Sequence, residues 1–328
     1  MRSATRFFPA RQASQDRPLA AIACVCAAVF LASIMDAVSK LLSAGYPVHQ
    51  LLFLRTLFAA PIIFAILLTR ARPAELFTAY WPLIVVRALI MCSAYLGFIL
   101  SVAVLQLADG VAIYFTMPLI VAGLAGPVLG EKVPWYRWIA VAVGFAGVVV
   151  MLRPGSSVFE PAALLALWSA MGYAAGQLMA RRLSAQVRPI VIVFWQNLIY
   201  LGVALVLALA TRLVPAGAVT HPSLVFLVRP WHLGPAFDMA LMTGLGIVSA
   251  VAMILFTEAY KQGEASFVAP FEYTAMLWAV IFGLILWGQL PGIATAIGGA
   301  LVIGAGLFML IAARRDRLAR LAGGPAEA

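Results

Sequence analysis

The sequence predicts an all-α integral membrane protein with ten transmembrane helices in two inverted five-helix repeats. Three observations predict this fold class: the composition, ten long apolar runs, and a motif order that recurs in the second half. Of the 328 residues, 64% are hydrophobic and 10% are charged, and the mean hydropathy is +1.03. Soluble domains carry about 25% charged residues. This composition therefore excludes a soluble enzyme, a disulfide scaffold and a disordered chain.

The apolar runs are long and unbroken, which is typical of membrane helices and not of the short alternating strands of a β-barrel. The predicted spans are 19–42, 48–68, 79–104, 108–129, 135–152, 160–180, 190–211, 238–260, 264–287 and 291–312. The first half is thus 19–152 and the second half is 160–312, with tails at 1–18 and 313–328. The first tail holds four arginines and no small-residue cleavage site, so we expect the first span to be retained. The longest loop, about 212–237, carries four prolines.

Lysine and arginine are unevenly distributed between alternate loops. Of the 22 basic residues, 16 fall on the side of the two termini, four on the opposite side, and Arg55 and Arg87 lie within spans. Because basic residues collect in cytoplasmic loops, both termini are predicted to be cytoplasmic. The net charge of +10 is explained by this topology signal, and we expect no nucleic-acid partner.

A motif order in the first half recurs in the second half. Residues 107–110 (Leu-Ala-Asp-Gly) precede a span that ends at 129–134, and residues 262–265 (Gln-Gly-Glu-Ala) precede a span that ends at 287–291. Five spans per half is an odd number, so the second copy must enter the bilayer in the opposite orientation. Inverted repeats are typical of secondary transporters.

The chain resembles the drug/metabolite transporter superfamily, EamA type, over about residues 19–312. The residues that carry the resemblance are 108–113, Met117-Pro118-Leu119, 129–132, 144–148, 153–155, 264–273 and 288–291, with Asp36, Lys40, Pro47, Gln50 and Arg55 in the first helix pair. Gln289 departs from the pattern, because the second repeat usually has glutamate there. The resemblance implies a secondary active transporter in the inner membrane, for a small polar or amphipathic metabolite, with export favoured.

Alternative functions stay open at this stage. The pattern in the first helix pair also fits an importer of a ring-bearing metabolite such as riboflavin or S-adenosylmethionine. A non-transporting membrane interaction protein is a weaker alternative. No nucleophile, phosphate-cradle or metal motif is present, and Cys24, Cys26 and Cys92 lie in apolar runs, so we predict no enzyme, cofactor or metal site.

Ionisable residues inside apolar spans are the main candidates for function, since a charge in the bilayer is costly unless it finds a partner. The candidates are Asp36, Lys40, Arg55, Arg87, Glu258 and Glu272. Helix rise places Asp36 and Arg55 at similar depths, about 9 and 10 Å from one face, and Arg87 and Glu272 about 12 Å from the other. Two pairs, Asp36–Arg55 and Arg87–Glu272, are therefore predicted. They bind substrate or carry protons as the coupling ion, or they are structural ion pairs.

The remaining predictions concern charged residues near span ends, aromatic side chains and prolines within spans. Lys40 lies close enough to the surface to extend its ammonium to water, and Glu258 lies near a span end. Tyr95, Tyr114, Trp168 and Tyr273 are candidates for rings that contact a substrate. Pro118 and Pro270 lie inside predicted spans and are candidates for helix kinks.

Overall fold

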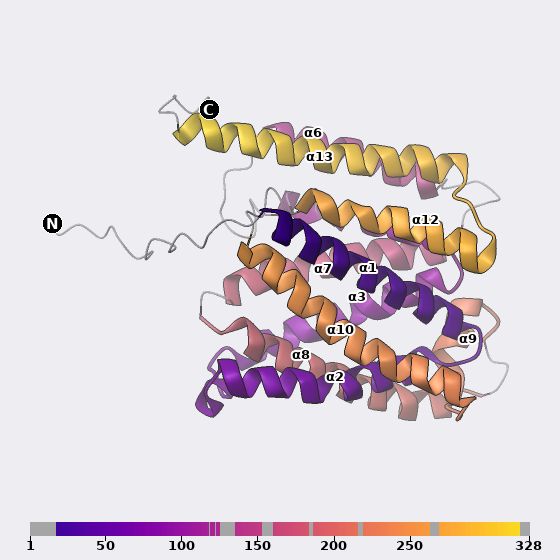
Figure 1. The fold of residues 1–328 in the computed structure, drawn as a ribbon. Helices are drawn as coiled ribbons and strands as arrows, with labels where there is room; N and C mark the ends of the chain where they lie inside the picture. Colours follow the sequence, from indigo (N-terminus) through magenta and orange to yellow (C-terminus); the bar gives the residue numbers. More distant parts are fainter. Residues whose placement is uncertain are drawn as a thin grey trace.

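The computed structural model describes residues 18–117, 119–121, 123–124, 135–152, 160–183, 186–215, 219–262 and 269–321, and in these ranges it is helical with no strand (Figure 1). The α-helices are α1 (Pro18–Ser43), α2 (Val48–Arg70), α3 (Trp81–Val102), α4 (Leu107–Tyr114), α6 (Trp135–Leu152), α7 (Ala162–Leu183), α8 (Pro189–Ala210), α9 (Pro222–Val228), α10 (Ala236–Gln262), α12 (Thr274–Trp287) and α13 (Ile293–Leu321). Three 3₁₀ helices are η1 (Pro73–Leu76), η2 (Thr211–Leu213) and η3 (Ala269–Tyr273).

Length and composition make this a multi-pass membrane protein. Among the described residues, six helices are long and apolar enough to cross a membrane: Leu19–Ser43, Val48–Arg70, Trp81–Val102, Ala162–Ala180, Pro189–Leu213 and Ala236–Phe256. Four shorter apolar helices lie at the other predicted spans: Leu107–Val121, Trp138–Leu152, Phe271–Trp287 and Ile293–Met309. Large apolar side chains such as Phe64, Phe145 and Ile285 are exposed on the bundle surface. A surface of this kind is suited to lipid and not to water.

Proline and glycine set several helix ends. Pro189 and Pro222 are the first residues of α8 and α9, where the missing N–H would have no partner in any case. The α12 helix ends at Gly288, whose φ of 64° is left-handed. The Gly288 N–H donates to the carbonyl of Leu284, which is the hydrogen bond of the αL type of helix C-cap, and the Gln289 N–H donates to the carbonyl of Gly283. Glycine is favoured there because a side chain strains this conformation.

Two predicted spans are not single continuous α-helices. In the span predicted at 108–129, α4 stops at Tyr114 and a turn follows, where the Thr116 hydroxyl donates to the Ile113 carbonyl at 2.8 Å. In the span predicted at 264–287, η3 precedes α12, and the Thr274 hydroxyl donates to the Phe271 carbonyl at 2.6 Å. A threonine hydroxyl that donates to a backbone carbonyl competes with the regular hydrogen bonds of the helix. Hydropathy does not reveal such a break in a helix.

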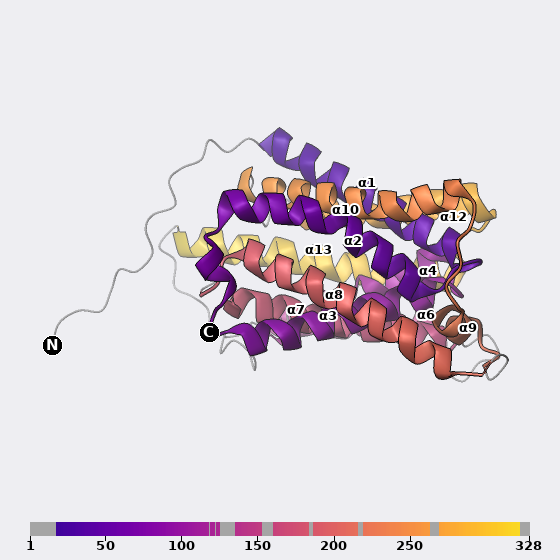
Figure 2. The same cartoon turned by 90° about the horizontal axis from the view of Figure 1, so that it is seen from below.

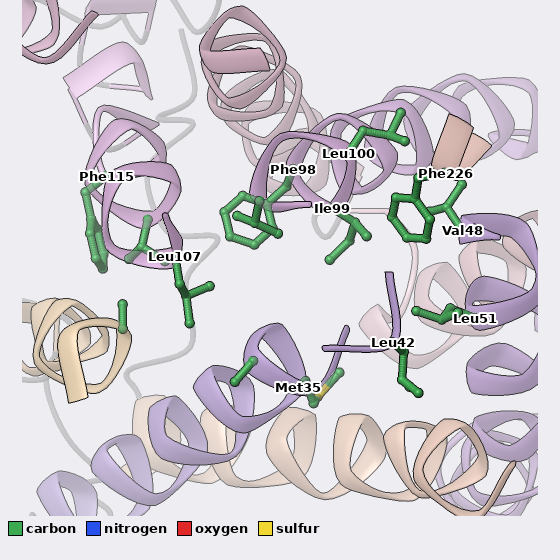
Figure 3. Packing of buried hydrophobic residues seen from close by; sticks show 14 of the residues in the cluster. Met35, Leu42, Val48, Leu51, Phe98, Ile99, Leu100, Leu107, Phe115 and Phe226 are labelled. Carbon is green, nitrogen blue, oxygen red and sulfur yellow. The ribbon is translucent and has the colours of Figure 1, made fainter. Parts of the chain in front are cut away.

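The predicted loop at 212–237 was wrong in one respect, because it contains a short helix, α9. The His221 ring accepts a hydrogen bond from the Ser223 N–H at 3.3 Å and so caps α9. Phe226 is fully buried against Val48 and Leu100, which lie on α2 and α3 (Figure 3). The prolines suggested an open loop, yet proline is compatible with the first turn of a helix.

The helices pack in pairs that repeat between the halves. The α3–α7 contact corresponds to α1–α10, and the α2–α10 contact corresponds to α3–α8. The α1–α12 contact likewise corresponds to α4–α7. The pairs α2–α8, α4–α12 and α6–α13 also form. If α1, α2, α3, α4 and α6 are exchanged with α7, α8, α10, α12 and α13, the first six contacts are exchanged in pairs and the last three map onto themselves. Figures 1 and 2 show α6 with α13 on one side of the bundle and α2 with α8 on the other.

The two halves start at opposite ends of the bundle. Ser43, at the end of α1, accepts a hydrogen bond from Arg229 at 3.1 Å, and Glu160, just before α7, lies 3.2 Å from His221. Both partners belong to residues 219–235 around α9, so α7 begins where α1 ends. We call this the α9 end. At the opposite end, here the η1 end, Arg188 before α8 pairs with Glu75 in η1.

The α6–α13 pair depends on a close backbone approach at two glycines. A Cβ atom added to Gly298 would lie 2.4 Å from the Gly147 carbonyl oxygen, and one added to Gly147 would lie 2.7 Å from the Gly298 carbonyl oxygen. Small residues let membrane helices approach closely enough for such backbone contact.

Candidate functional site

Arg55 lies at the centre of the candidate site, on α2. Its guanidinium carbon lies 4.5 Å from the centre of the Tyr95 ring on α3, and Tyr95 lies 6.2 Å from the Tyr200 ring on α8. Asp36 on α1 lies within electrostatic range of Arg55. The structure thus brings the predicted pair into one region, where Arg55 also makes a cation–π contact with Tyr95.

Arg87 lies beside this region and is held by α7 and α8. Its side chain is 7% exposed, Nε donates to the Gly176 carbonyl at 2.9 Å, and a terminal N–H donates to Gln196 Oε1 at 2.6 Å. Gln196 in turn donates to the Tyr200 hydroxyl at 3.4 Å. These hydrogen bonds join α3 to α7 and α8, and they hold the Arg87 guanidinium in place. The predicted partner, Glu272, shares with Arg87 an electrostatic neighbour, Tyr173.

A row of aromatic rings continues from this region toward the second half. Tyr114 on α4 lies 5.5 Å from Tyr173 on α7, and Phe115 lies 5.1 Å from Tyr273 in η3. Glu272, next to Tyr273, interacts electrostatically with Tyr114 and Tyr173. The structure therefore brings Tyr114, Glu272 and Tyr273 together. We define the central cluster as Asp36, Arg55, Arg87, Tyr95, Tyr114, Tyr173, Gln196, Tyr200, Glu272 and Tyr273.

Tyr200 and Gln196 were not among the predicted site residues. Both are on α8, four positions apart, so they share one face of the helix. Together with Asn197, whose amide donates to the Thr56 carbonyl at 3.1 Å, they are the polar residues of an otherwise apolar run. These two amides and the tyrosine, close together in an apolar span, could have indicated a polar site in the sequence. The prediction considered mainly charged residues and therefore missed them.

Lys40 does not extend to water as expected. It is 8% exposed, and its ammonium donates to the carbonyls of Val102, the last residue of α3, and Leu105, in the connection that follows. It also lies 5.3 Å from the Trp287 ring. The carbonyls at a helix end lack hydrogen-bond partners within the helix. The buried ammonium of Lys40 supplies donors to them, which it could not do if it extended to water.

The other predicted residues are Trp168, Glu258, Pro118 and Pro270. Trp168 is 53% exposed, and its position on α7 is rotated by about 140° from that of Tyr173. Glu258 is half-buried near the end of α10. Pro118 lies outside the described residues. Pro270 lies in the 3₁₀ helix η3, directly before α12, and its role as a helix kink stays a prediction.

Comparison with known proteins identifies the family. The sequence model of the EamA-like transporter family matches residues 19–153 and 160–311. The chain belongs to this family. The resemblance seen in the sequence motifs is thereby confirmed, and the family is one of transporters and not of enzymes.

Relatives of this EamA-like transporter have different named substrates. It is 22% identical to an S-adenosylmethionine uptake transporter of Rickettsia prowazekii, over 87% of this chain and 90% of the relative. It is 26% identical to a pseudopaline exporter of Pseudomonas aeruginosa, over 84% and 90%. A riboflavin transporter of Vibrio cholerae is 29% identical, over 60% and 59%. The relatives therefore include both uptake and export proteins.

A protein of known crystal structure shares the fold. It superposes with a TM-score of 0.60 and covers 90% of this chain and 98% of that chain, at 20% sequence identity. At that identity the likeness supports the arrangement of helices in this EamA-like transporter and does not bear on its substrate.

Proposed function

We propose that the protein is a secondary active transporter that moves a small, ring-bearing, amphipathic metabolite across the inner membrane by alternating access. The observation that carries the proposal is the guanidinium of Arg55 against the Tyr95 ring, at the eighth residue of a 23-residue apolar helix. A permanent charge at that depth is costly without a function or a partner. The Tyr200 ring on α8 lies 6.2 Å from the Tyr95 ring, and Tyr200 also interacts electrostatically with Arg55.

The proposed architecture of ten spans in two inverted halves would suit alternating access. Six long and four shorter apolar helices occupy the ten predicted positions, and helix contacts interchange when the halves are exchanged. Because α7 begins where α1 ends, an exchange of the halves would also exchange the two ends of the bundle. Such an exchange converts a site open to one side into a site open to the other. We propose that both termini are cytoplasmic.

The chemistry of the central cluster favours a zwitterion or a polar ring system. Arg55 can bind a carboxylate, Asp36 and Glu272 can bind a cationic or donor group, and the tyrosine rings can stack on a planar group. S-Adenosylmethionine and riboflavin, the named substrates of two relatives, both combine a ring system with polar groups.

Export is the proposed direction, as the family resemblance favours, and the pseudopaline exporter supports it. Uptake is the second candidate, which the S-adenosylmethionine relative favours. Protons are the proposed coupling ion, because Asp36 and Glu272 are carboxylates within apolar helices.

Counterflow in vesicles tests the proposed function. Purified protein is reconstituted in vesicles that are preloaded with S-adenosylmethionine or riboflavin, and exchange of the labelled compound is measured with and without an imposed proton gradient. Wild-type protein should exchange at least one compound, and Arg55→Gln should reduce the rate at least about tenfold, equal to a loss of about 1.4 kcal/mol of binding or transition free energy. Arg212→Gln is the matched control, because Arg212 is exposed in η2.

Full exchange by Arg55→Gln would reject the assigned site. The side of each loop is tested separately by labelling single cysteines at positions 75 and 220 in a background without native cysteines. We expect only position 75 to be labelled from the cytoplasm.

A further inference from the structure

A cavity lies at the α9 end, and none of the residues that line it belongs to the central cluster. Its volume is about 470 Å³. The walls come from the end of α1, the α3–α4 connection, α9, and the end of α12. Small-molecule sites commonly enclose about 300 to 1,000 Å³, so this cavity has room for a metabolite or a lipid head group.

The charged groups that line this cavity are cationic. Lys40 and Arg229 both line it, and none of the described residues in its wall is acidic. Each cation is held in place, since Lys40 donates to the Val102 and Leu105 carbonyls and Arg229 donates to the Ser43 carbonyl. An ammonium has three N–H donors and a guanidinium has five, so both keep donors for a ligand.

An acidic neighbour of Lys40 lies outside the lining. Asp109 on α4 interacts electrostatically with Lys40 and also accepts a hydrogen bond from the Thr295 hydroxyl at 2.6 Å. Asp109 neutralises part of the Lys40 charge without lining the cavity. Arg229 is therefore the cation with the greater excess charge toward the cavity.

The cavity also contains an unsatisfied acceptor and apolar surface. Gln289 lines it, and among the described residues the buried Oε1 atom of Gln289 has no hydrogen-bond partner. A buried acceptor without a donor is costly, so a donor on a bound molecule would relieve that cost. Phe226 and Trp287 supply apolar wall.

We propose that this cavity binds an organic anion, with its carboxylate or phosphate on Lys40 and Arg229, a donor group on Gln289, and its apolar body against Phe226 and Trp287. The site is four residues along α1 from Asp36, about 6 Å by helix rise, so it lies next to the central cluster. It joins α9 to elements of both halves. The anion is a soluble metabolite that enters or leaves by this end, or the head group of an anionic lipid.

Binding of flavin mononucleotide and of riboflavin tests the site, because the two share a ring system and differ in a phosphate. Fluorescence anisotropy is measured on the full chain in phosphatidylcholine nanodiscs. Flavin mononucleotide should bind at least about tenfold more tightly than riboflavin, and Arg229→Gln should remove that preference. Arg212→Gln, at the same end but outside the cavity, should keep it.

Two further variants separate this site from the central cluster and from misfolding. Val225→Trp should block flavin mononucleotide by filling the cavity while it leaves both cations in place. Arg55→Gln should keep the preference for the phosphate even if it abolishes transport, so the two proposals fail separately. Equal binding of the two flavins, or full binding of flavin mononucleotide by both Arg229→Gln and Val225→Trp, would overturn the site.

The source of the anion is resolved by adding phosphatidylglycerol to the nanodiscs. Weaker binding of flavin mononucleotide would identify a lipid head group as the occupant, since it competes for the same cations. Unchanged binding would identify a soluble anion.

Discussion

The two halves of the bundle share their packing but not their chemistry. Arg55 is the eighth residue of α2, and Gln196 is the eighth residue of α8, the helix that packs against α2 as its counterpart in the second half. Arg55 lies against the Tyr95 ring, whereas Gln196 accepts a hydrogen bond from Arg87. Equivalent positions therefore carry a cation in one half and a neutral amide in the other.

This difference shows that the central cluster is one asymmetric site and not two copies of a symmetric one. Of the charged residues in this cluster, Asp36, Arg55 and Arg87 come from α1 to α3, while Glu272 comes from η3. In the proposed mechanism, repetition of the fold would supply the rocking geometry, and divergence of side chains between the halves would supply the polarity that a substrate recognises.

The largest loss of stability should come from placing an arginine in the second half at the position equivalent to Arg55. Gln196→Arg places a second guanidinium where Arg87 now donates at 2.6 Å. An uncompensated buried charge commonly costs about 3 kcal/mol or more, so we expect a marked fall in thermal stability of the purified protein. Gln196→Met removes the acceptor without adding charge and should cost less. Equal stability of Gln196→Arg and wild type would show that this region is open to water.

A smaller effect should come from the shared packing. Gly298→Ala introduces a methyl group 2.4 Å from the Gly147 carbonyl oxygen, so α6 and α13 must separate. Overpacking of this kind costs about 1 to 3 kcal/mol. Gly304→Ala, on the same helix with no atom within 4 Å of the added carbon, is the matched control and should be neutral. The comparison is measured by thermal unfolding of the two variants side by side.

A third prediction concerns a contact at the α9 end. Tyr46, between α1 and α2, donates to Asp238 in the first turn of α10. This hydrogen bond, with burial and the carboxylate charge, raises the pKa of Tyr46 from 10.0 to about 12. The native state then holds the phenol proton more tightly than the unfolded state, so the contribution to stability is full below about pH 10 and is lost as pH rises toward 12.

Phenolate absorbance during a pH titration checks this prediction. In Asp238→Asn one tyrosine should titrate closer to pH 10 than in wild type, because the carboxylate charge has been removed. Identical titration curves for the two proteins would contradict the assignment.

The smallest effect is expected at the equivalent contact of the other half. Arg188, between α7 and α8, pairs with Glu75 before α3, with the nitrogen and oxygen 2.8 Å apart and the side chains 57% and 31% exposed. Exposed ion pairs contribute about 0 to 1 kcal/mol and weaken with salt. Glu75→Gln should therefore change the free energy of unfolding by less than about 1 kcal/mol, with the difference vanishing in high salt. A larger loss would show that this end is held as firmly as the α9 end.

The sequence alone determined the membrane class, the helix positions and the family. A bilayer requires each span to be apolar and to satisfy its own backbone hydrogen bonds. Apolar runs therefore located the helices without knowledge of their neighbours. The approximate depths of Asp36 and Arg55 followed from helix rise, and the structure does bring the two residues into one region.

Only the tertiary structure decided which side chains meet. Lys40 was expected to extend outward, but the end of α3 lies beside it and offers two carbonyls. Gln196 and Tyr200 joined the cluster because α8 crosses α2 and α3, and Phe226 became buried because α9 folds over the bundle end. Contacts between helices depend on packing geometry and close approach, as at Gly147 and Gly298, and these are properties of two surfaces together that no single span contains.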